Sequence, residues 1–551
     1  MTTTSRIHWW ISVALLMLCG LMAMVFWGPR ESLAVVPRRP EDRNFLRVAY
    51  AQYLLPDPHR RTLPFPTHNH FILSLWEPLV ECDPATGQPQ PAAAESWEWS
   101  ADRLTLTLKL RPDARWSNGD PVTAHDFVRS WLRLLRQRME LAQTLFMLKN
   151  AEAYHLGRLS ETREVGVHAI DNLTLRLELA QIRSTLVAEL ADPLLSPLHY
   201  TSEKVLADGS YFYDPARLTT NGPFRLVQAN YDGFRLEVCE YYHGRAGIRL
   251  TGAEFIRVDN LAIAPLLLAA GVVDMVSPAA YGGGGEMPTN RQVTRKSELV
   301  LAVSSLDFNV TRGPLRDIRV RQALALALDR AGTIKKYDTG RLVPAWSWVP
   351  DMPGREGLVL LKEDADEARR LLATAGYPGG KGFPVLNMAL TIGSSKDPYP
   401  SAWTERWFQE LGVKTHISYE PMPVRAQRLM AGDYDVLYGT LIATVPDAGD
   451  LLGGFLWPAE YSNTKWIDQE MIHLLNEANT KMGPERLEVL EKAERLAMAA
   501  VPTVPVTFTR RQAMLAAEVQ GWYADPLGRQ SIKRLWLAHA PASNSNPEPK
   551  L

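Results

Sequence analysis

Residues 94–127 read AESWEWSADRLTLTLKLRPDARWSNGDPVTAHDF and hold two short strand patterns. Every second position from Leu104 to Leu110 is a leucine, and the residues between them are Thr and Lys. A side-chain period of two puts the leucines on one face, which predicts a half-buried strand. Trp97 and Trp99 form a second alternation just before the polar turn SADR. The two segments are therefore predicted to pair as a hairpin.

The end of the same stretch predicts a turn followed by a helix. Asn118-Gly119 is a strong turn signal because both residues tolerate positive φ. Thr123 can cap the free N–H groups of a helix, and the acid Asp126 follows it closely, as in a capping box. The apolar residues that come next have helical spacing: Phe127, Trp131, Leu132, Leu134 and Leu135. This stretch contains no catalytic pattern, so we expect it to be scaffold.

Three motifs carry a family resemblance. The first is the order ESW, strand, WSNGxPVTAxDF. It resembles the signature of the peptide-binding receptors that serve ABC importers. These receptors are the extracellular solute-binding proteins of the oligopeptide/dipeptide family, also called family 5. The loop TNGPF at residues 220–224 and the segment from Phe308 to Leu324 resemble two further motifs of that family. In the second segment Asp317 can cap a helix, and Arg319 and Arg321 are expected to brace loops. The resemblance extends over about residues 45–539.

The resemblance implies an α/β fold with two lobes, the periplasmic-binding-protein-like fold of type II, with an extra subdomain. The apolar run near the N-terminus predicts one transmembrane helix that precedes this fold. Lobe 1 is expected to be discontinuous and to include the C-terminal strand region. The expected segments are a tail (1–8), an anchor or signal (9–27), a linker (28–43), lobe 1 (44–84, 194–310 and 507–539), the extra subdomain packed on it (85–193), lobe 2 (311–506) and a disordered polar tail (540–551).

Length and charge agree with a receptor of several domains. The chain has 551 residues, too many for one compact core. Its 60 basic and 61 acidic residues nearly cancel, whereas a nucleic-acid partner usually requires a basic face. We therefore expect no nucleic-acid partner. Among the three cysteines, Cys82 and Cys239 are either buried free thiols or one disulfide formed in an oxidising compartment.

An apolar run without charges covers residues 9–27. It is long enough to span a bilayer as a helix, and it exceeds the usual apolar core of a secretory signal, about 7–15 residues. We expect an uncleaved anchor in the cytoplasmic membrane, with the bulk of the chain on the outer side. The close alternative is a signal peptide cleaved after Ser32-Leu33-Ala34, which has the small-x-small pattern of a cleavage site. Cys19 lacks the small residue before it that lipidation requires.

Recognisable catalytic motifs are missing from the sequence. It has no GxSxG elbow, no HExxH, no phosphate-binding GxxxxGK[ST] and no calcium-binding loop. His68 and His70 are the nearest approach to a metal pair, but no neighbouring acid or cysteine completes a tetrahedron. We expect neither an enzyme nor a bound metal or cofactor.

The resemblance also points to candidate ligand-binding residues. Peptide receptors of this type hold the ligand's α-ammonium with an Asp inside a GWxxDYx[DE]P loop. In an ungapped register that position is Thr444, and Asp447 is the anchor if the loop is shifted. Tyr438 falls where oligopeptide receptors carry an Arg, and Lys396 falls near a position where they carry His. These departures predict relaxed or altered peptide recognition.

The function implied is that of an extracytoplasmic, periplasmic component of an ABC importer. It would bind oligopeptides or similar solutes between the lobes and deliver them, as a monomer, to permease subunits. Hinge closure around the ligand is the mechanism that the resemblance implies. One alternative keeps the fold but makes the protein a membrane-anchored peptide sensor or scaffold. A further alternative is an anchored hydrolase, because active sites can assemble from residues far apart in the sequence.

Overall fold

The structure is a computed structural model. The apolar run 9–27, Lys396 and the tail 540–551 lie outside the residues that it describes. Within the described part, no helix combines the length and the apolar character needed to cross a membrane. The described residues are 43–50, 54–60, 66–137, 142–259, 263–276, 293–338, 340–394, 397–459 and 461–538.

An eleven-stranded sheet runs from one end of the molecule to the other. Its two longest strands, β12 and β17, pair antiparallel, and the second half of β12 is buried along its whole length. Such a run suits a strand covered on both faces. The spatial order is β15 (Thr415–Glu420), β14 (Leu386–Thr391), β16 (Val436–Ile442), β12 (Val293–Phe308), β17 (Thr503–Ala516), β11 (Met275–Val276), β1 (Phe45–Tyr50), β10 (Gly252–Arg257), β9 (Gly233–Val238) and β8 (Phe224–Asn230), with β13 (Leu342–Pro344) beside β17.

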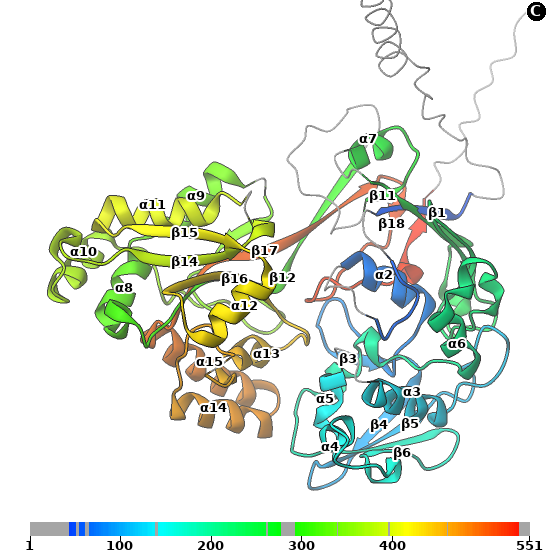
Figure 1. The fold of residues 1–551 in the computed structure, drawn as a ribbon. Coiled ribbons are helices and arrows are strands. Elements are labelled where there is room, and N and C mark those ends of the chain that lie inside the picture. The colour runs from blue at the N-terminus through cyan, green and yellow to red at the C-terminus, as the bar shows by residue number, and fades with distance from the viewer. Residues whose placement is uncertain are drawn as a thin grey trace, which may run out of the picture.

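Two separate hydrophobic cores divide the molecule into two bodies, which are joined by β12 and β17 (Figure 1). The first core draws on residues 46–276 and 514–537, and we call its body the first lobe. The second core draws on residues 301–508 and Leu527, and we call its body the second lobe. The second core already includes Leu301, before the expected boundary at residue 310, because β12 passes from one body to the other as a single strand.

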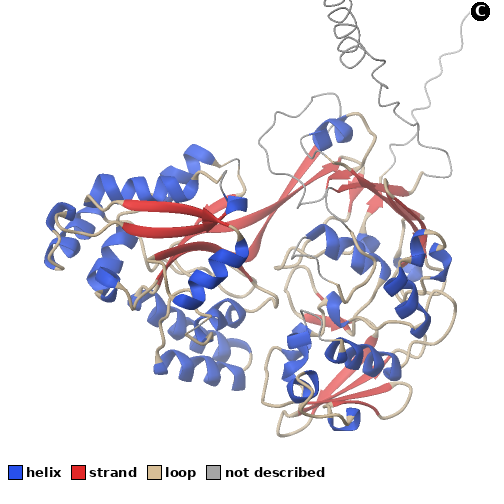
Figure 2. Cartoon of the chain, in the orientation of Figure 1, coloured by secondary structure: helices blue, strands red, loops and turns tan. Residues whose placement is uncertain are grey.

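Helices cover the sheet in both lobes, and in the second lobe they lie on both sides of its strands (Figure 2). The first lobe contains α2 (Pro66–Leu75), α3 (Ala124–Arg136), α4 (Ala151–His155), α5 (Leu186–Glu189), α6 (Tyr200–Asp208) and α7 (Ala264–Ala269). The second lobe contains α8 (Ile318–Leu326), α9 (Arg330–Tyr337), α10 (Ala365–Thr374), α11 (Tyr399–Leu411), α12 (Met422–Ala431), α13 (Ala448–Leu452), α14 (Gln469–Thr480) and α15 (Gly483–Ala500).

The predicted hairpin is confirmed as part of a four-stranded sheet in the first lobe. β4 (Ala94–Trp99) pairs antiparallel with β5 (Thr105–Leu110), and the leucines of β5 are buried on one face. β7 (Thr174–Glu178) and β6 (Val167–Ala169) complete the sheet. Two small ribbons also belong to this lobe: β2 (Val80–Cys82) with β3 (Pro89–Pro91), and β18 (Val519–Gln520) with β19 (Trp536–Leu537).

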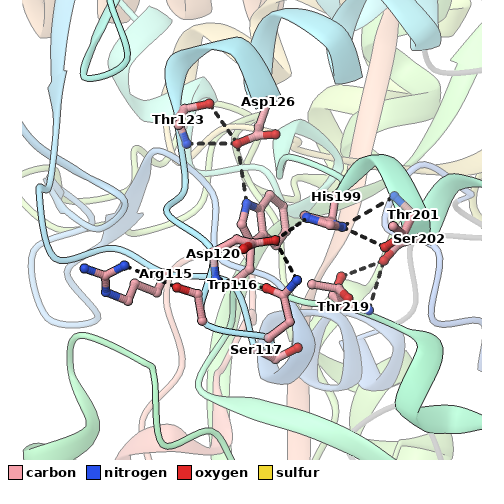
Figure 3. A network of polar contacts seen from close by, with 12 residues as sticks. Arg115, Trp116, Ser117, Asp120, Thr123, Asp126, His199, Thr201, Ser202 and Thr219 are labelled. Carbon is pink, nitrogen blue, oxygen red and sulfur yellow. Dashed lines mark hydrogen bonds and ion pairs between the residues drawn. The ribbon is translucent and has the colours of Figure 1, made fainter.

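The WSNGDPVTAHD signature is scaffold, as predicted (Figure 3). The Asp126 carboxylate accepts hydrogen bonds from the backbone N–H and the hydroxyl of Thr123, both at 2.9 Å, and so fixes the start of α3. Trp116 Nε1 donates to the same carboxylate at 3.4 Å. Ser117 N–H donates to the Thr220 carbonyl at 2.7 Å, which ties the signature to the TNGPF loop. The two motifs therefore hold each other in place.

The motif around Asp317 is also structural. Asp317 caps α8 by accepting a hydrogen bond from Arg319 N–H at 2.9 Å, which confirms the predicted cap. Arg321 is buried, and it donates to the carbonyls of Leu315 and Val501 at 2.8 and 3.0 Å. Arg321 thus braces loops, as expected, whereas the Arg319 side chain pairs with Asp317 and donates to the Thr374 carbonyl at the end of α10, at 3.0 Å.

Candidate functional site

The strand β16 has one edge that lacks a strand partner over much of its length. Its other edge pairs with β12 from Val436 to Ile442. β14 reaches only Val436 and Leu437 on the open side. Among the described residues, none extends the ladder on this side over positions 438–442. Backbone N–H and C=O groups on such an edge are available to an added strand.

Two cavities adjoin this strand. The first, of about 380 Å³, lies within the second lobe and is lined by polar groups that include Asp307, Asp397, Arg425 and Tyr438, together with the aromatic rings of Trp348, Phe455 and Trp457. The second, of about 420 Å³, is lined by residues of both lobes. Leu441, Gly454 and Trp457 line both cavities, so the two spaces are neighbours along the strand.

The second cavity lies where the lobes face each other. The first lobe contributes Arg183 and Glu189, and the second contributes Thr444 and Asp450. Arg183 Nε donates to both carboxylate oxygens of Glu189, at 2.6 and 2.8 Å. Glu189 is therefore paired within its own lobe. A further cavity of about 420 Å³, also lined by Glu189 and Thr444, extends this space toward Phe146 and Met147.

Asp450 places a carboxylate beside Thr444, one of the candidate anchoring positions. Its Oδ2 accepts hydrogen bonds from the Thr444 N–H at 2.5 Å, the Thr444 hydroxyl at 3.1 Å and the Val445 N–H at 3.2 Å. Burial raises the pKa of Asp450, and the negative charge of Glu189 raises it further. A cationic ligand group would offset both effects, because an opposite charge favours the ionised carboxylate.

Asp447, the other candidate acid, is committed to structure. It caps α13 by accepting a hydrogen bond from Gly449 N–H at 2.7 Å. Both of its carboxylate oxygens accept from the buried Arg486, at 3.0 Å from Nε and 2.7 Å from Nη2. Asp450, which sequence reasoning missed, is the next acid along the chain. The turn that starts α13 brings the Asp450 side chain close to Thr444. No local sequence pattern indicates this contact.

The other two candidates have separate outcomes. Tyr438 lines the first cavity together with Asp397. Burial raises the pKa of Tyr438, and the negative charge of Asp397 acts in the same direction. Lys396 lies outside the described residues. Of these two candidates, the first cavity is therefore lined by Tyr438.

In the part of the chain that the structure describes, no residues come together as a reactive cysteine site or a metal site. Cys82 and Cys239 are both buried and free. Burial raises the pKa of the Cys82 thiol to about 11, which disfavours the reactive thiolate. Across the described ranges, no three His, Cys, Asp or Glu side chains gather as a metal ion would require.

Comparisons with known proteins converge on one group. Residues 88–463 match the model of the bacterial extracellular solute-binding proteins, family 5. The oligopeptide-binding protein OppA of Bacillus subtilis is 26% identical over 447 residues, covering 77% of this chain and 80% of that protein. The periplasmic oligopeptide-binding protein OppA of Salmonella typhimurium is 25% identical over 488 residues, covering 84% and 87%. Among solved structures, the unliganded open form of the murein tripeptide-binding protein MppA superposes with a TM-score of 0.76 at 22% identity, covering 90% of this chain and 98% of that one.

Proposed function

The chain belongs to the bacterial extracellular solute-binding proteins of family 5, and from this premise we propose that it binds short peptides between its two lobes and delivers them to the permease of an ABC importer. The protein acts by binding and not by catalysis. It works outside the cytoplasm as a monomer, and its partners are the peptide and the permease subunits.

The open edge of β16 is the observation that carries this proposal. Peptides add to such edges as an extra strand, and the shared backbone hydrogen bonds give affinity without reading side chains. This edge adjoins two cavities, one of which faces the other lobe. A peptide bound here touches both lobes when they close.

The cation of the peptide N-terminus is held by Asp450. A buried ammonium requires a counter-charge, because an unpaired one is strongly disfavoured. Asp450 lies in the cavity between the lobes, while Asp447 is already paired with Arg486. Thr444 orients Asp450 through its backbone N–H and its hydroxyl and does not itself supply the charge.

Tyr438 and Lys396 remain candidate ligand-binding residues, and we now place them at the end of the ligand away from its N-terminus. The first cavity, in which Tyr438 lies, takes that end. Residues 9–27 hold the protein to the cytoplasmic membrane, with removal as a signal peptide as the alternative.

Calorimetry with tetraalanine tests the binding mode. We expect tetraalanine to bind, and we expect an N-methyl group on one central peptide nitrogen to weaken binding about tenfold, because it removes one strand-like hydrogen bond. The matched control is a tetraalanine that is methylated on the other central peptide nitrogen. Alternate N–H groups of a strand point to opposite sides, so methylation there should weaken binding less. Equal affinity of all three peptides would contradict the added strand.

The same mixtures test the hydrolase alternative. Mass spectrometry of tetraalanine after prolonged incubation with the protein should recover the intact peptide. Shorter alanine fragments that form in proportion to the amount of protein would contradict a purely binding role.

A further inference from the structure

We propose that Arg103 holds the two lobes together on the side of the molecule away from β12 and β17, and so slows the release of a bound peptide. Arg103 lies in the turn between β4 and β5 of the first lobe. Its Nη1 donates a hydrogen bond at 3.2 Å to the carbonyl of Thr480, the last residue of α14 in the second lobe. In Figure 1, β4 and α14 both lie in the lower part of the view, away from the crossing of β12 and β17. The effect on release rests on the proposed function, whereas the effect on the lobes does not.

The β4–β5 turn fixes the backbone from which the Arg103 side chain extends. The Arg103 N–H donates to the Ser100 carbonyl at 2.9 Å. The Asp102 carboxylate accepts hydrogen bonds from the Ser100 hydroxyl at 2.6 Å and from the Leu104 N–H at 3.0 Å. Arg103 has a φ of 57°, in the left-handed region that glycine adopts without steric cost. The turn by itself would therefore accept a glycine, and nothing in its backbone requires an arginine.

The first lobe orients the Arg103 guanidinium but does not neutralise it. Its Cζ lies 5.9 Å from the centroid of the Trp99 ring, within the range of a cation–π contact. Its Nη2 is buried without a hydrogen-bond partner, so part of the guanidinium is shielded from water. Within the described residues, Arg103 forms no ion pair. The guanidinium is thus held by an aromatic ring of its own lobe and by a carbonyl of the other lobe.

The group that receives this hydrogen bond is the C-terminal end of α14. The last four carbonyls of a helix lack partners within the helix, and the helix dipole favours a cation at this end. The Glu477 carbonyl accepts from the Thr480 hydroxyl at 2.8 Å, and the Ala478 carbonyl accepts from the Lys481 N–H at 3.2 Å. The Thr480 carbonyl accepts from Arg103. The first lobe therefore supplies both a donor and a positive charge to this helix end.

The contact lies directly beside the space between the lobes. Asn479, the residue before the contact on α14, lines the second cavity. On the side of the first lobe, the Leu179 N–H donates to the Leu104 carbonyl at 2.8 Å, and Ala180 lines the cavity that extends this space. Arg103 itself lines neither cavity. It is therefore a positioning residue, which holds two walls of the ligand space together from outside.

Separation of the lobes has to break this hydrogen bond. The lobes are joined by β12 and β17, so they separate by rotation about that connection, and points away from it move more than points beside it. The bond between Arg103 and Thr480 must break before a peptide enclosed between the lobes can leave. Its loss should speed release, whereas the entry of a peptide into lobes that have already separated should change little.

Stopped-flow fluorescence with the full chain and tetraalanine measures both rates, because Trp457 lines both cavities beside β16 and should report binding. We expect Arg103→Gly to release tetraalanine about threefold to tenfold faster, as for the loss of one hydrogen bond. The association rate constant should change by less than about twofold, since most affinity differences within one interface lie in the dissociation rate. Arg103→Lys keeps a cation at the helix end and should restore part of the slow release.

Two controls separate this effect from a loss of folding or of charge. Glycine adopts a positive φ freely, so urea unfolding of Arg103→Gly should show no loss in the free energy of unfolding. Arg103→Asn, which also tolerates a positive φ, should release tetraalanine as fast as the glycine variant. Arg163→Ala is the matched control, because Arg163 is exposed on the same lobe and pairs with Glu161 close to it in the chain; it should release tetraalanine as the unmodified protein does.

Each other outcome has a defined meaning. Unchanged release from the glycine and asparagine variants overturns the inference and leaves the proposed function standing. Equally fast release from Arg163→Ala, or a lysine variant as fast as the glycine variant, also overturns it, because the effect would not depend on a cation at Thr480. If tetraalanine does not bind, the proposed function fails, and small-angle X-ray scattering without peptide decides the inference alone. A larger radius of gyration for Arg103→Gly than for the unmodified protein then supports it, and an equal radius overturns it.

Discussion

Two acids on the same short segment have different tasks. Asp447 caps α13 and pairs with a buried arginine, so its negative charge is already balanced inside the second lobe. Asp450 is held by the backbone of Thr444 and Val445 through a single oxygen, and it lies in the cavity between the lobes. Removing either charge should therefore have effects that are easy to tell apart.

We predict that Asp450→Asn abolishes the preference for a free peptide N-terminus. In the unmodified protein, N-acetylation of tetraalanine should cost on the order of 2–5 kcal/mol of binding free energy, as for truncating one partner of a buried charge pair. Calorimetry with the free and acetylated peptides measures the difference. Asp447→Asn should keep that preference and instead lower the free energy of unfolding by about 3 kcal/mol, because it leaves Arg486 unpaired. The reverse pattern would identify Asp447 as the anchor.

A buried histidine makes stability depend on pH. His59 Nε2 donates to the Ser196 carbonyl at 3.1 Å, and its Nδ1 accepts from Arg133 at 2.9 Å. Burial lowers the pKa of His59 to about 4. The positive charge of Arg133 also lowers this pKa, whereas the negative charge of Asp57 raises it. Protonation would remove the acceptor that Arg133 uses.

We predict that this histidine contributes to acid unfolding. The folded pKa lies below the unfolded value of 6.5, so the contribution is complete above pH 6.5 and is lost as the pH falls toward about 4. The loss is at most about 1.4 kcal/mol per pH unit. Urea unfolding at several pH values measures it, and His59→Gln should reduce the slope between pH 6.5 and 4.5. An unchanged slope in that variant would contradict the assignment.

At the scale of elements, the WSNGDPVTAHD and TNGPF motifs of the first lobe do not line the two cavities beside β16. The WSNGDPVTAHD segment and the TNGPF loop contact each other through Ser117 and Thr220, inside the first lobe. The two cavities are lined instead by residues of β16, α12 and α13, among others. The WSNGDPVTAHD segment and the TNGPF loop therefore serve the folding of the first lobe and do not line these cavities.

The N-terminal apolar run is an element whose fate can be measured directly. We predict that residues 9–27 stay attached to the mature protein and retain it in the cytoplasmic membrane, because the run is as long as a membrane-spanning helix. N-terminal sequencing of the protein purified from membranes should find the run present. A mature protein that begins at Val35 would show instead that it is a cleaved signal.

At the scale of the whole molecule, β12 and β17 connect the two lobes. The register of their pairing shifts between Leu299 and Val303. This shift separates the part of the pair that lies next to β11 from the part that lies next to β16. A register shift interrupts the ladder locally and bends a strand. A second shift follows between Ser304 and Ser305, so the bend in the connection lies at residues 299–305.

We predict that ligand binding closes the lobes about this point. Small-angle X-ray scattering should give a smaller radius of gyration with saturating peptide than without it. The protein without peptide is the starting state. Calorimetry on the same sample must establish saturation, and an unchanged radius at saturation would count against closure.

Local sequence patterns determined most of the elements and the family. The leucine alternation of β5, the start of α3 at Thr123 and the cap of α8 at Asp317 all follow from contacts between residues close in the chain. Such contacts depend on side-chain period, turn chemistry and capping, which a single sequence displays.

Only the tertiary structure decided which charged side chains face the ligand cavities. Counting along the chain pointed to Thr444 and Asp447, but the direction of the turn into α13 brings Asp450 to the cavity and Arg486 to Asp447. Arg425 reaches Tyr438 because α12 packs against the sheet beside β16, and the two residues belong to different elements. The position of a charge in a cavity depends on how distant elements pack, and periodicity within one element carries no information about that packing.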